Sequence, residues 1–236
     1  MFLGLTAVLF DLDNTVYGYD ECHEGGLQQS FEVGRDLHEN FGTFQKFCLA
    51  YEAAKNQVKL PLKGKAAGHC RFLYFKNQIE SAFGRTLHHE TANLHNAYWE
   101  GYFAKMVIEP GSKELLTRLR DKGVPTAWVT NFTTERQFQK LERLGLIDAT
   151  DFLVSSEEVG SEKPTPEGIY RALKLLGIQP SPSVILVGDN LGEDREAASS
   201  AGVGFIWYRK NSIIELTPQH SFPSAESWHQ LRELLL

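Results

Sequence analysis

The chain has 236 residues, of which 42% are hydrophobic and 23% charged, values typical of a globular protein with a substantial core. Its formal net charge of −6, without a basic cluster, argues against nucleic acid as a main partner. No apolar run approaches the roughly 20 residues of a membrane span, and the three cysteines lack CxxC or zinc-site spacing. We therefore expect a cytoplasmic protein with one domain, which could carry a smaller insert.

The first predicted element is a short apolar strand at residues 5–10. A signal peptide fits this start less well, because no basic residues precede the apolar run and no small-residue cleavage site follows it. The run leads directly into FDLDNTV, residues 10–16, which places Asp11 and Asp13 one residue apart at the end of the strand. Two carboxylates this close repel each other, so such pairs share a proton or bind a cation.

The next stretch, residues 17–105, contains no clear strand. Helical periodicity predicts helices in four segments, which are 26–41, 43–58, 69–83 and 90–103. Glycines and a proline separate these segments. We therefore expect a helical insert at 17–105, between the first and second strands of a core formed by residues 1–16 and 106–236.

From residue 106 onward, short apolar runs alternate with helical patterns. Strands are predicted at 124–130, 152–155, 183–187 and 203–208. Helices are predicted at 133–144, 166–176, 192–201 and 225–235, and Gly145 is a natural end for the first of them. Apolar strands separated by single helices predict an α/β fold, with a doubly wound, Rossmann-like parallel sheet covered on both faces.

Polar side chains follow four of these strands, at the edge where an open parallel sheet binds its ligand. The set comprises Asp11, Asp13, Thr130, Asn131, Lys163, Asp189 and Asp194. Each residue also has a purely structural alternative. Acids can end turns or favour a helix N-terminus, Thr130 and Asn131 can cap the following helix, and Lys163 can be a solvated loop residue.

The four segments FDLDNT, VTN, EKPTPEG and VGDNLGED resemble, in order and strand context, the four motifs of the haloacid dehalogenase superfamily. The helical insert between the first two segments resembles the C1 cap of that superfamily. The resemblance spans about residues 5–208 and implies phosphoryl transfer at the carboxyl edge of the sheet.

The resemblance assigns different tasks to the two acids of the first motif. Asp11 would attack phosphorus and form an aspartyl-phosphate, while Asp13 would protonate the leaving oxygen and then activate a water. Lys163 and Thr130 would hold the phosphoryl oxygens, with Asn131 as a further donor.

The same resemblance implies Mg²⁺ as the cofactor, since it is a hard cation that prefers oxygen ligands. The Asp11 carboxylate, the Asp13 backbone carbonyl and Asp189 would hold it. Asp194 would pair with Lys163 or orient a water ligand of the metal. Tyr17, just after the first motif, is a candidate substrate contact at the hinge of the cap.

An acid at position 13 favours a phosphatase over a dehalogenase or a phosphonatase, because an alkoxide leaving group needs a proton. We expect a substrate among the small phosphomonoesters, such as a sugar phosphate, phosphoglycolate or a nucleoside monophosphate, since a cap that excludes water also excludes macromolecules. A phosphomutase similar to β-phosphoglucomutase, or a non-catalytic binding protein on the same scaffold, is the alternative. No pattern fixes the exact substrate or the oligomeric state.

Overall fold

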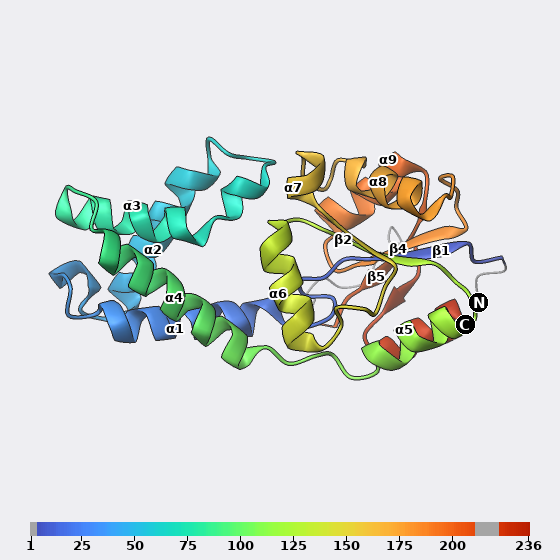
Figure 1. The fold of residues 1–236 in the computed structure, drawn as a ribbon, viewed down its shortest axis with the longest axis horizontal. Coiled ribbons are helices and arrows are strands. Elements are labelled where there is room, and N and C mark those ends of the chain that lie inside the picture. The colour runs from blue at the N-terminus through green and yellow to red at the C-terminus, as the bar shows by residue number, and fades with distance from the viewer. Residues whose placement is uncertain (1–3, 211–221) are drawn as a thin grey trace. The chain divides into compact units, whose positions relative to one another are not determined.

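The computed structural model of the protein describes residues 4–210 and 222–236. The chain forms two compact units, each with its own interior (Figure 1). The sheet unit consists of Met1–Gly18 and Val107–Leu236, and the helical unit is Tyr19–Met106. Within the described ranges, no helix is both long enough and apolar enough to cross a membrane.

Among the residues that the structure describes, the sheet unit contains six parallel strands in the order β3-β2-β1-β4-β5-β6. They are β1 (Ala7–Phe10), β2 (Thr126–Thr130), β3 (Phe152–Ser155), β4 (Val184–Gly188), β5 (Gly204–Tyr208) and β6 (Ser224–Ala225). Strand β1 lies between β2 and β4, so it is buried by neighbours on both sides. The predicted α/β fold with a parallel sheet is confirmed.

Helices cover both faces of this sheet. Successive side chains of a strand point to opposite faces, so an entirely apolar strand such as β1 presents apolar side chains on both. Leu9 packs in one apolar cluster with α8 (Glu167–Leu176) and α9 (Glu196–Ala201). The next residue, Phe10, stacks on Trp228 of α10 (Trp228–Leu235), with ring centroids 5.4 Å apart. Helix α10 in turn contacts α5 (Ser112–Asp121), and Figure 1 shows α5 on the side of the sheet away from α8 and α9.

Most of the predicted helices in this unit form with small shifts at their ends. Helix α6 is Thr134–Leu144 and ends at Gly145, whose φ of 66° is the left-handed conformation that favours glycine. The helix predicted at 192–201 begins as a π-helical turn, Leu191–Arg195, and the Asn190 side chain caps this turn by accepting from two backbone N–H groups. The closing helix starts at Trp228 instead of residue 225, because Ser227 caps it and Ser224–Ala225 pairs with β5.

The helical unit contains α1 (Tyr19–Gly34), α2 (Phe44–Lys59), α3 (Arg71–Phe83) and α4 (His88–Lys105). The helix predicted at 26–41 is wrong in its bounds, since α1 begins seven residues earlier and residues 39–41 form a separate turn. Glycines let α1 lie close against α4. A side chain at Gly26 would come within 2.8 Å of Tyr98, and one at Gly101 would overlap the carbonyl of Gly25. Gly26 therefore serves helix packing inside α1 instead of ending it, and Gly101 does the same inside α4.

The interior of the helical unit is aromatic, and the buried Arg71 and the half-buried His23 lie in it. His23 Nδ1 lies 2.7 Å from the Tyr98 hydroxyl. Burial lowers the pKa of His23 to about 3, and the nearby charges of Arg71, Lys55 and Lys59 add to the effect. Arg71 donates to the His69 carbonyl at 2.8 Å and to the Tyr19 hydroxyl at 2.5 Å.

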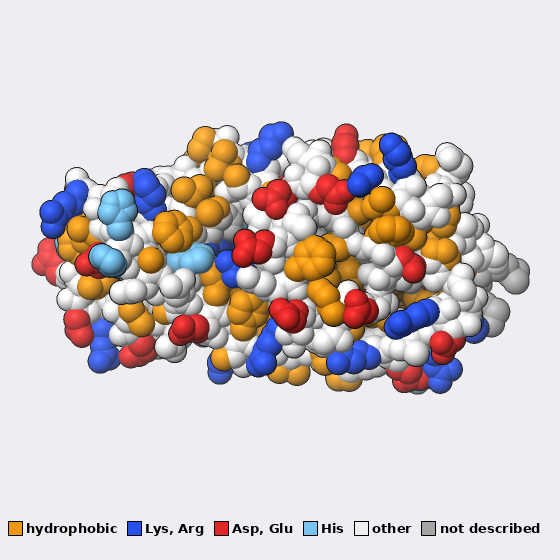
Figure 2. Space-filling view, viewed as in Figure 1, with side chains coloured by type: hydrophobic (Ala, Val, Ile, Leu, Met, Phe, Trp, Pro, Cys, Tyr) orange, Lys and Arg blue, Asp and Glu red, His pale blue; other side chains and the backbone are white. Residues whose placement is uncertain are grey.

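On the face in view in Figure 2, acidic and basic side chains are interspersed.

Candidate active site

The carboxyl end of β1 delivers Asp11 into the interior of the sheet unit. Its backbone N–H donates to Val187 of the neighbouring strand β4 at 2.8 Å. The chain then turns sharply at Asn14, whose φ is 60°. The Thr15 hydroxyl donates to Asp11 Oδ2 at 3.3 Å, and the indole of Trp228 donates to the Thr15 carbonyl at 2.9 Å. The loop that carries the first acid is thus held from three sides.

Lys163 joins this acid to the fourth motif. Its ammonium nitrogen lies 2.5 Å from Asp11 Oδ1, 2.6 Å from Asp194 Oδ1 and 3.0 Å from the Val129 carbonyl. Burial alone would lower the pKa of Lys163, but the two carboxylates outweigh it and raise that pKa. Of the two predicted partners of Asp194, the structure shows the lysine.

Asn131 fixes the segment that carries Lys163. Its side-chain oxygen accepts from the Lys163 backbone N–H at 2.8 Å, and its amide donates to the Lys163 carbonyl at 3.2 Å. The same amide lies 3.1 Å from Glu193 Oε2. In this arrangement Asn131 orients the lysine through its backbone, while a direct contact with a phosphoryl group stays a prediction.

Three carboxylates meet beside Lys163. Asp11, Asp189 and Asp194 each offer an oxygen, and these oxygens all lie within 4.8 Å of one another. Gly188 makes room for this, because a side chain there would overlap the carboxyl group of Asp194. The Asp189 carbonyl accepts from the Trp207 indole at 2.9 Å, which fixes the end of β4.

Burial and mutual repulsion make Asp11 and Asp189 hard to ionise without a cation. Burial raises the pKa of Asp11 to about 7, with Lys163 opposing the shift and the charges of Asp194 and Asp13 adding to it. Burial, followed by the charges of Asp11 and Asp194, raises the pKa of Asp189 to about 9. An all-oxygen donor set of this kind fits a hard divalent cation such as Mg²⁺.

Asp13 faces a different partner. Its carboxylate oxygens lie 2.7 and 3.0 Å from the ammonium nitrogen of Lys140, in helix α6. The hydroxyl of the fully buried Tyr17 also donates to Asp13 Oδ1. The sequence predicts Tyr17 as a substrate contact at the hinge of the cap, and the structure shows its hydroxyl donating to Asp13. A substrate contact by Tyr17 stays a prediction.

Thr130, at the end of β2, is contacted from the same helix. The Gln137 amide lies 2.5 Å from the Thr130 hydroxyl oxygen and 3.3 Å from the Asn131 carbonyl. Sequence reasoning missed both Gln137 and Lys140. Their spacing with Leu141 and Leu144 could have revealed them, because two polar residues stand on the apolar stripe of an amphipathic helix.

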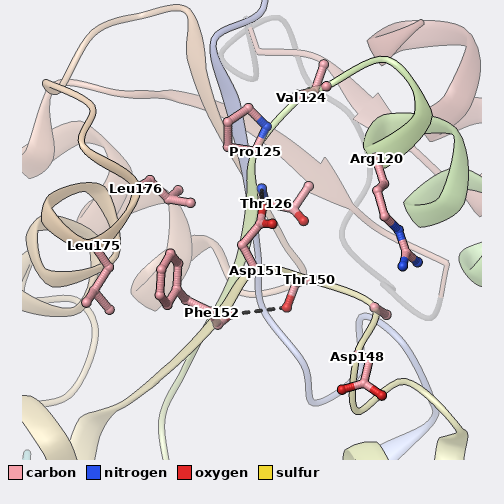
Figure 3. A pocket seen from close by; sticks show the side chains of 12 residues that line it. Arg120, Val124, Pro125, Thr126, Asp148, Thr150, Asp151, Phe152, Leu175 and Leu176 are labelled. Carbon is pink, nitrogen blue, oxygen red and sulfur yellow. Dashed lines mark hydrogen bonds between the residues drawn. The ribbon is translucent and has the colours of Figure 1, made fainter.

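A separate pocket of about 530 Å³ lies at the opposite end of the strands (Figure 3). Residues at the start of β2 and just before β2 and β3 line it, among them Pro125, Thr126 and Asp151. The Thr126 backbone N–H donates to the Asp151 carboxylate at 2.8 Å, so this acid serves to join the two strands. The acids and Lys163 gather at the carboxyl ends instead, which is where we place the candidate active site.

Comparison with known proteins identifies the family. Residues 47–208 match the family model described as haloacid dehalogenase-like hydrolase, which is more than half of the chain. The chain belongs to the haloacid dehalogenase-like hydrolase family. The predicted superfamily and the prediction of a hydrolase are therefore confirmed. Thr130, Lys163 and Asp189 fall inside the matched range, while Asp11 and Asp13 precede it.

Members of this family with curated functions resemble most of the chain. A ribulose-1,5-bisphosphate 5-phosphatase from Halopiger xanaduensis is 41% identical over 217 residues, which cover 90% of this chain and 88% of that protein. A glyceraldehyde 3-phosphate phosphatase from Methanopyrus kandleri is 27% identical, covering 92% and 89%. The crystal structure of a phosphatase of this family from Thermococcus onnurineus has the same fold, with a TM-score of 0.73 at 23% identity and 97% of each chain covered.

Proposed function

We propose that this protein is a Mg²⁺-dependent phosphatase of small phosphomonoesters that works through an aspartyl-phosphate on Asp11. The observation that carries the proposal is the placement of the Asp11 carboxylate between the Lys163 ammonium and two further acids. A nucleophilic carboxylate, a fixed cation and a set of oxygen ligands are the groups that phosphoryl transfer to an acid requires.

The proposed reaction has two steps. In the first, an Asp11 oxygen attacks phosphorus, the bond from phosphorus to the leaving oxygen breaks, and Asp13 gives that oxygen its proton. In the second, Asp13 takes a proton from a water that attacks phosphorus, and the bond between phosphorus and Asp11 breaks. Lys163 and Thr130 would hold the phosphoryl oxygens during both steps.

The chemistry that a bound Mg²⁺ supplies is positive charge between the Asp11 carboxylate and the phosphoryl group, which otherwise repel each other. Asp11, Asp189 and the Asp13 backbone carbonyl would hold the ion. Asp194 would act through Lys163, since its carboxylate pairs with that ammonium.

The substrate class is proposed from the names of the relatives, which are phosphatases of sugar phosphates and of a sugar bisphosphate. We propose phosphorylated sugars as the first class to test, followed by phosphoglycolate and nucleoside monophosphates. We also propose that the helical unit acts as the cap that selects among them, and that the protein works in the cytoplasm.

The decisive experiment measures phosphate release by the purified protein with Mg²⁺ across a panel of these phosphomonoesters, including ribulose 1,5-bisphosphate. Asp11→Asn is the matched variant, and it should lose turnover by a factor of about 10³ or more while keeping its fold. Rapid quenching with a radiolabelled substrate should trap label on the wild-type protein and none on the variant.

Three outcomes would contradict the proposal. Full activity of Asp11→Asn would exclude the aspartyl-phosphate. Conversion of a sugar phosphate to an isomer with little phosphate release would indicate a phosphomutase. Absence of release from every panel member would favour a non-catalytic binding protein.

A further inference from the structure

Helix α6 presents two polar side chains to the interior of the sheet unit. Gln137 and Lys140 are both fully buried, and they lie about one helical turn apart on the same face. Gln137 contacts the Thr130 hydroxyl, whereas Lys140 contacts Asp13. One helix thus reaches two different side chains of the candidate active site.

The contact between Lys140 and Asp13 is geometrically specific. The ammonium nitrogen lies within hydrogen-bond distance of both carboxylate oxygens, at 2.7 and 3.0 Å. The Phe132 ring centroid lies 4.5 Å from the same nitrogen, so the ring face adds a cation–π contact. The Tyr17 hydroxyl donates to one of the two Asp13 oxygens. Together these contacts fix the carboxyl group in one orientation.

A buried lysine is costly to desolvate, so the fold retains one only where partners compensate for the lost hydration. Asp13 is its carboxylate partner here, with a side chain that is 24% exposed, while that of Lys140 is 0% exposed. The charged pair therefore has a buried end at Lys140 and an accessible end at Asp13. The accessible end is the group proposed to exchange a proton with the substrate.

We propose that Lys140 is a positioning residue, which holds the Asp13 carboxyl group in place for proton transfer to the leaving oxygen. This inference rests on the proposed function. When the bond from phosphorus to the leaving oxygen breaks, the Asp13 proton moves to that oxygen and Asp13 becomes a carboxylate. The Lys140 ammonium stabilises this carboxylate until Asp13 takes a proton from the attacking water.

The test compares substrates whose leaving groups differ in their need for a proton. An alkoxide from a sugar phosphate needs one, whereas p-nitrophenolate leaves without it. The measured quantity is kcat/KM, which reports the steps up to departure of the leaving group. In Lys140→Met, kcat/KM for the sugar phosphate should fall about 10²-fold further than for p-nitrophenyl phosphate, within the range of general acid catalysis. Lys140→Arg should recover part of the loss, because a guanidinium can also donate to both oxygens.

Gln137→Leu is the matched control from the same helix face. It affects Thr130 and hence the phosphoryl group, which is common to all substrates, so it should lower kcat/KM for both substrates by a similar factor. An equal loss on both substrates in Lys140→Met would overturn the inference, because it would indicate a purely structural role.

A second comparison covers the case in which Lys140→Met is poorly folded. In an Asp13→Asn background, Lys140→Arg should cause no further loss of kcat/KM on the sugar phosphate, since the residue acts through Asp13. Losses that add in the double variant would contradict the inference. A wild-type protein that releases no phosphate from any substrate would instead contradict the proposed function, so the two failures are distinct.

Discussion

The Lys163 ammonium nitrogen lies 2.5 Å from Asp11 Oδ1 and is buried with it. Removing one partner of a buried ion pair leaves an uncompensated charge, which typically costs about 3–5 kcal/mol. Lys163→Met should therefore lose both activity and stability. Lys76→Met is the matched control, because Lys76 pairs with Glu80 and the two side chains are 39% and 31% exposed. That change should cost much less stability.

The loss in Lys163→Met should depend on pH. Lys163 lowers the pKa of Asp11, so its removal moves that pKa further above the ordinary value of 3.8. A folded-state pKa above the unfolded one means that the folded protein binds more protons, so its stability falls as pH rises. Urea unfolding of the metal-free variant should show a larger deficit at pH 8 than at pH 5. An equal deficit at both pH values would argue against this coupling.

Mg²⁺ should stabilise the wild-type protein more as pH rises. Without metal, the raised pKa values of Asp11, about 7, and Asp189, about 9, predict that stability declines between about pH 4 and pH 9. The ion binds the ionised carboxylates, so its effect on Tm should grow over the same window. At a free concentration about a hundred times Kd, binding adds about 2.7 kcal/mol. Thermal unfolding with Mg²⁺ or with EDTA, at equal ionic strength, measures the difference in Tm at each pH. A Tm difference that does not change with pH would count against the proposed metal site.

Asp189→Asn should separate metal binding from folding. In the metal-free protein it removes one of three acids that repel each other, so stability should stay unchanged or rise at pH 8. The Tm increase on adding Mg²⁺ should be lost. Asp148→Asn, an exposed acid beside the pocket at the other end of the sheet, should keep the full Mg²⁺ response. A normal response in Asp189→Asn would remove this residue from the ligand set.

The helical unit should become less stable in acid because of His23. Its folded pKa of about 3 lies below the ordinary 6.5, so the unfolded state binds more protons between these values and stability falls as pH drops through that range. One such proton accounts for at most about 1.4 kcal/mol per pH unit. Hydrogen exchange of the α1 and α4 amides, corrected for intrinsic exchange rates, should show this loss of stability as pH falls. The loss should be smaller in His23→Gln. The exposed His89, changed to Gln, should leave the pH dependence as it is.

The sheet and much of the candidate site could be predicted because their signals are local. Strands such as β4 are apolar runs of strand length, and parallel strands bring their carboxyl ends to one edge. That rule alone brings Asp11, Lys163 and Asp189 together. The pairing of Lys163 with Asp194 is one of two roles that the resemblance implies for Asp194, and the structure shows this contact at 2.6 Å.

The remaining features depend on contacts that no local pattern carries. Lys140 meets Asp13 only after α6 has packed, and a lysine in a helix is more often solvated. The sequence predicts that the first helix of this unit begins at Gly26, whereas α1 begins at Tyr19 and Gly26 makes room for Tyr98 of α4. The two-residue strand β6 is too short to have a periodicity.

The position of β1 at the centre of the sheet has a consequence for synthesis of the chain. Both partners of β1 are made late, since β2 and β4 follow the entire helical unit in the sequence. Until they emerge, the apolar segment Ala7–Phe10 has no strand to pair with and stays open to other chains. Non-local pairing of this kind is also slow. We therefore expect the nascent protein to depend on chaperones or on low temperature during expression, even where the finished protein is stable.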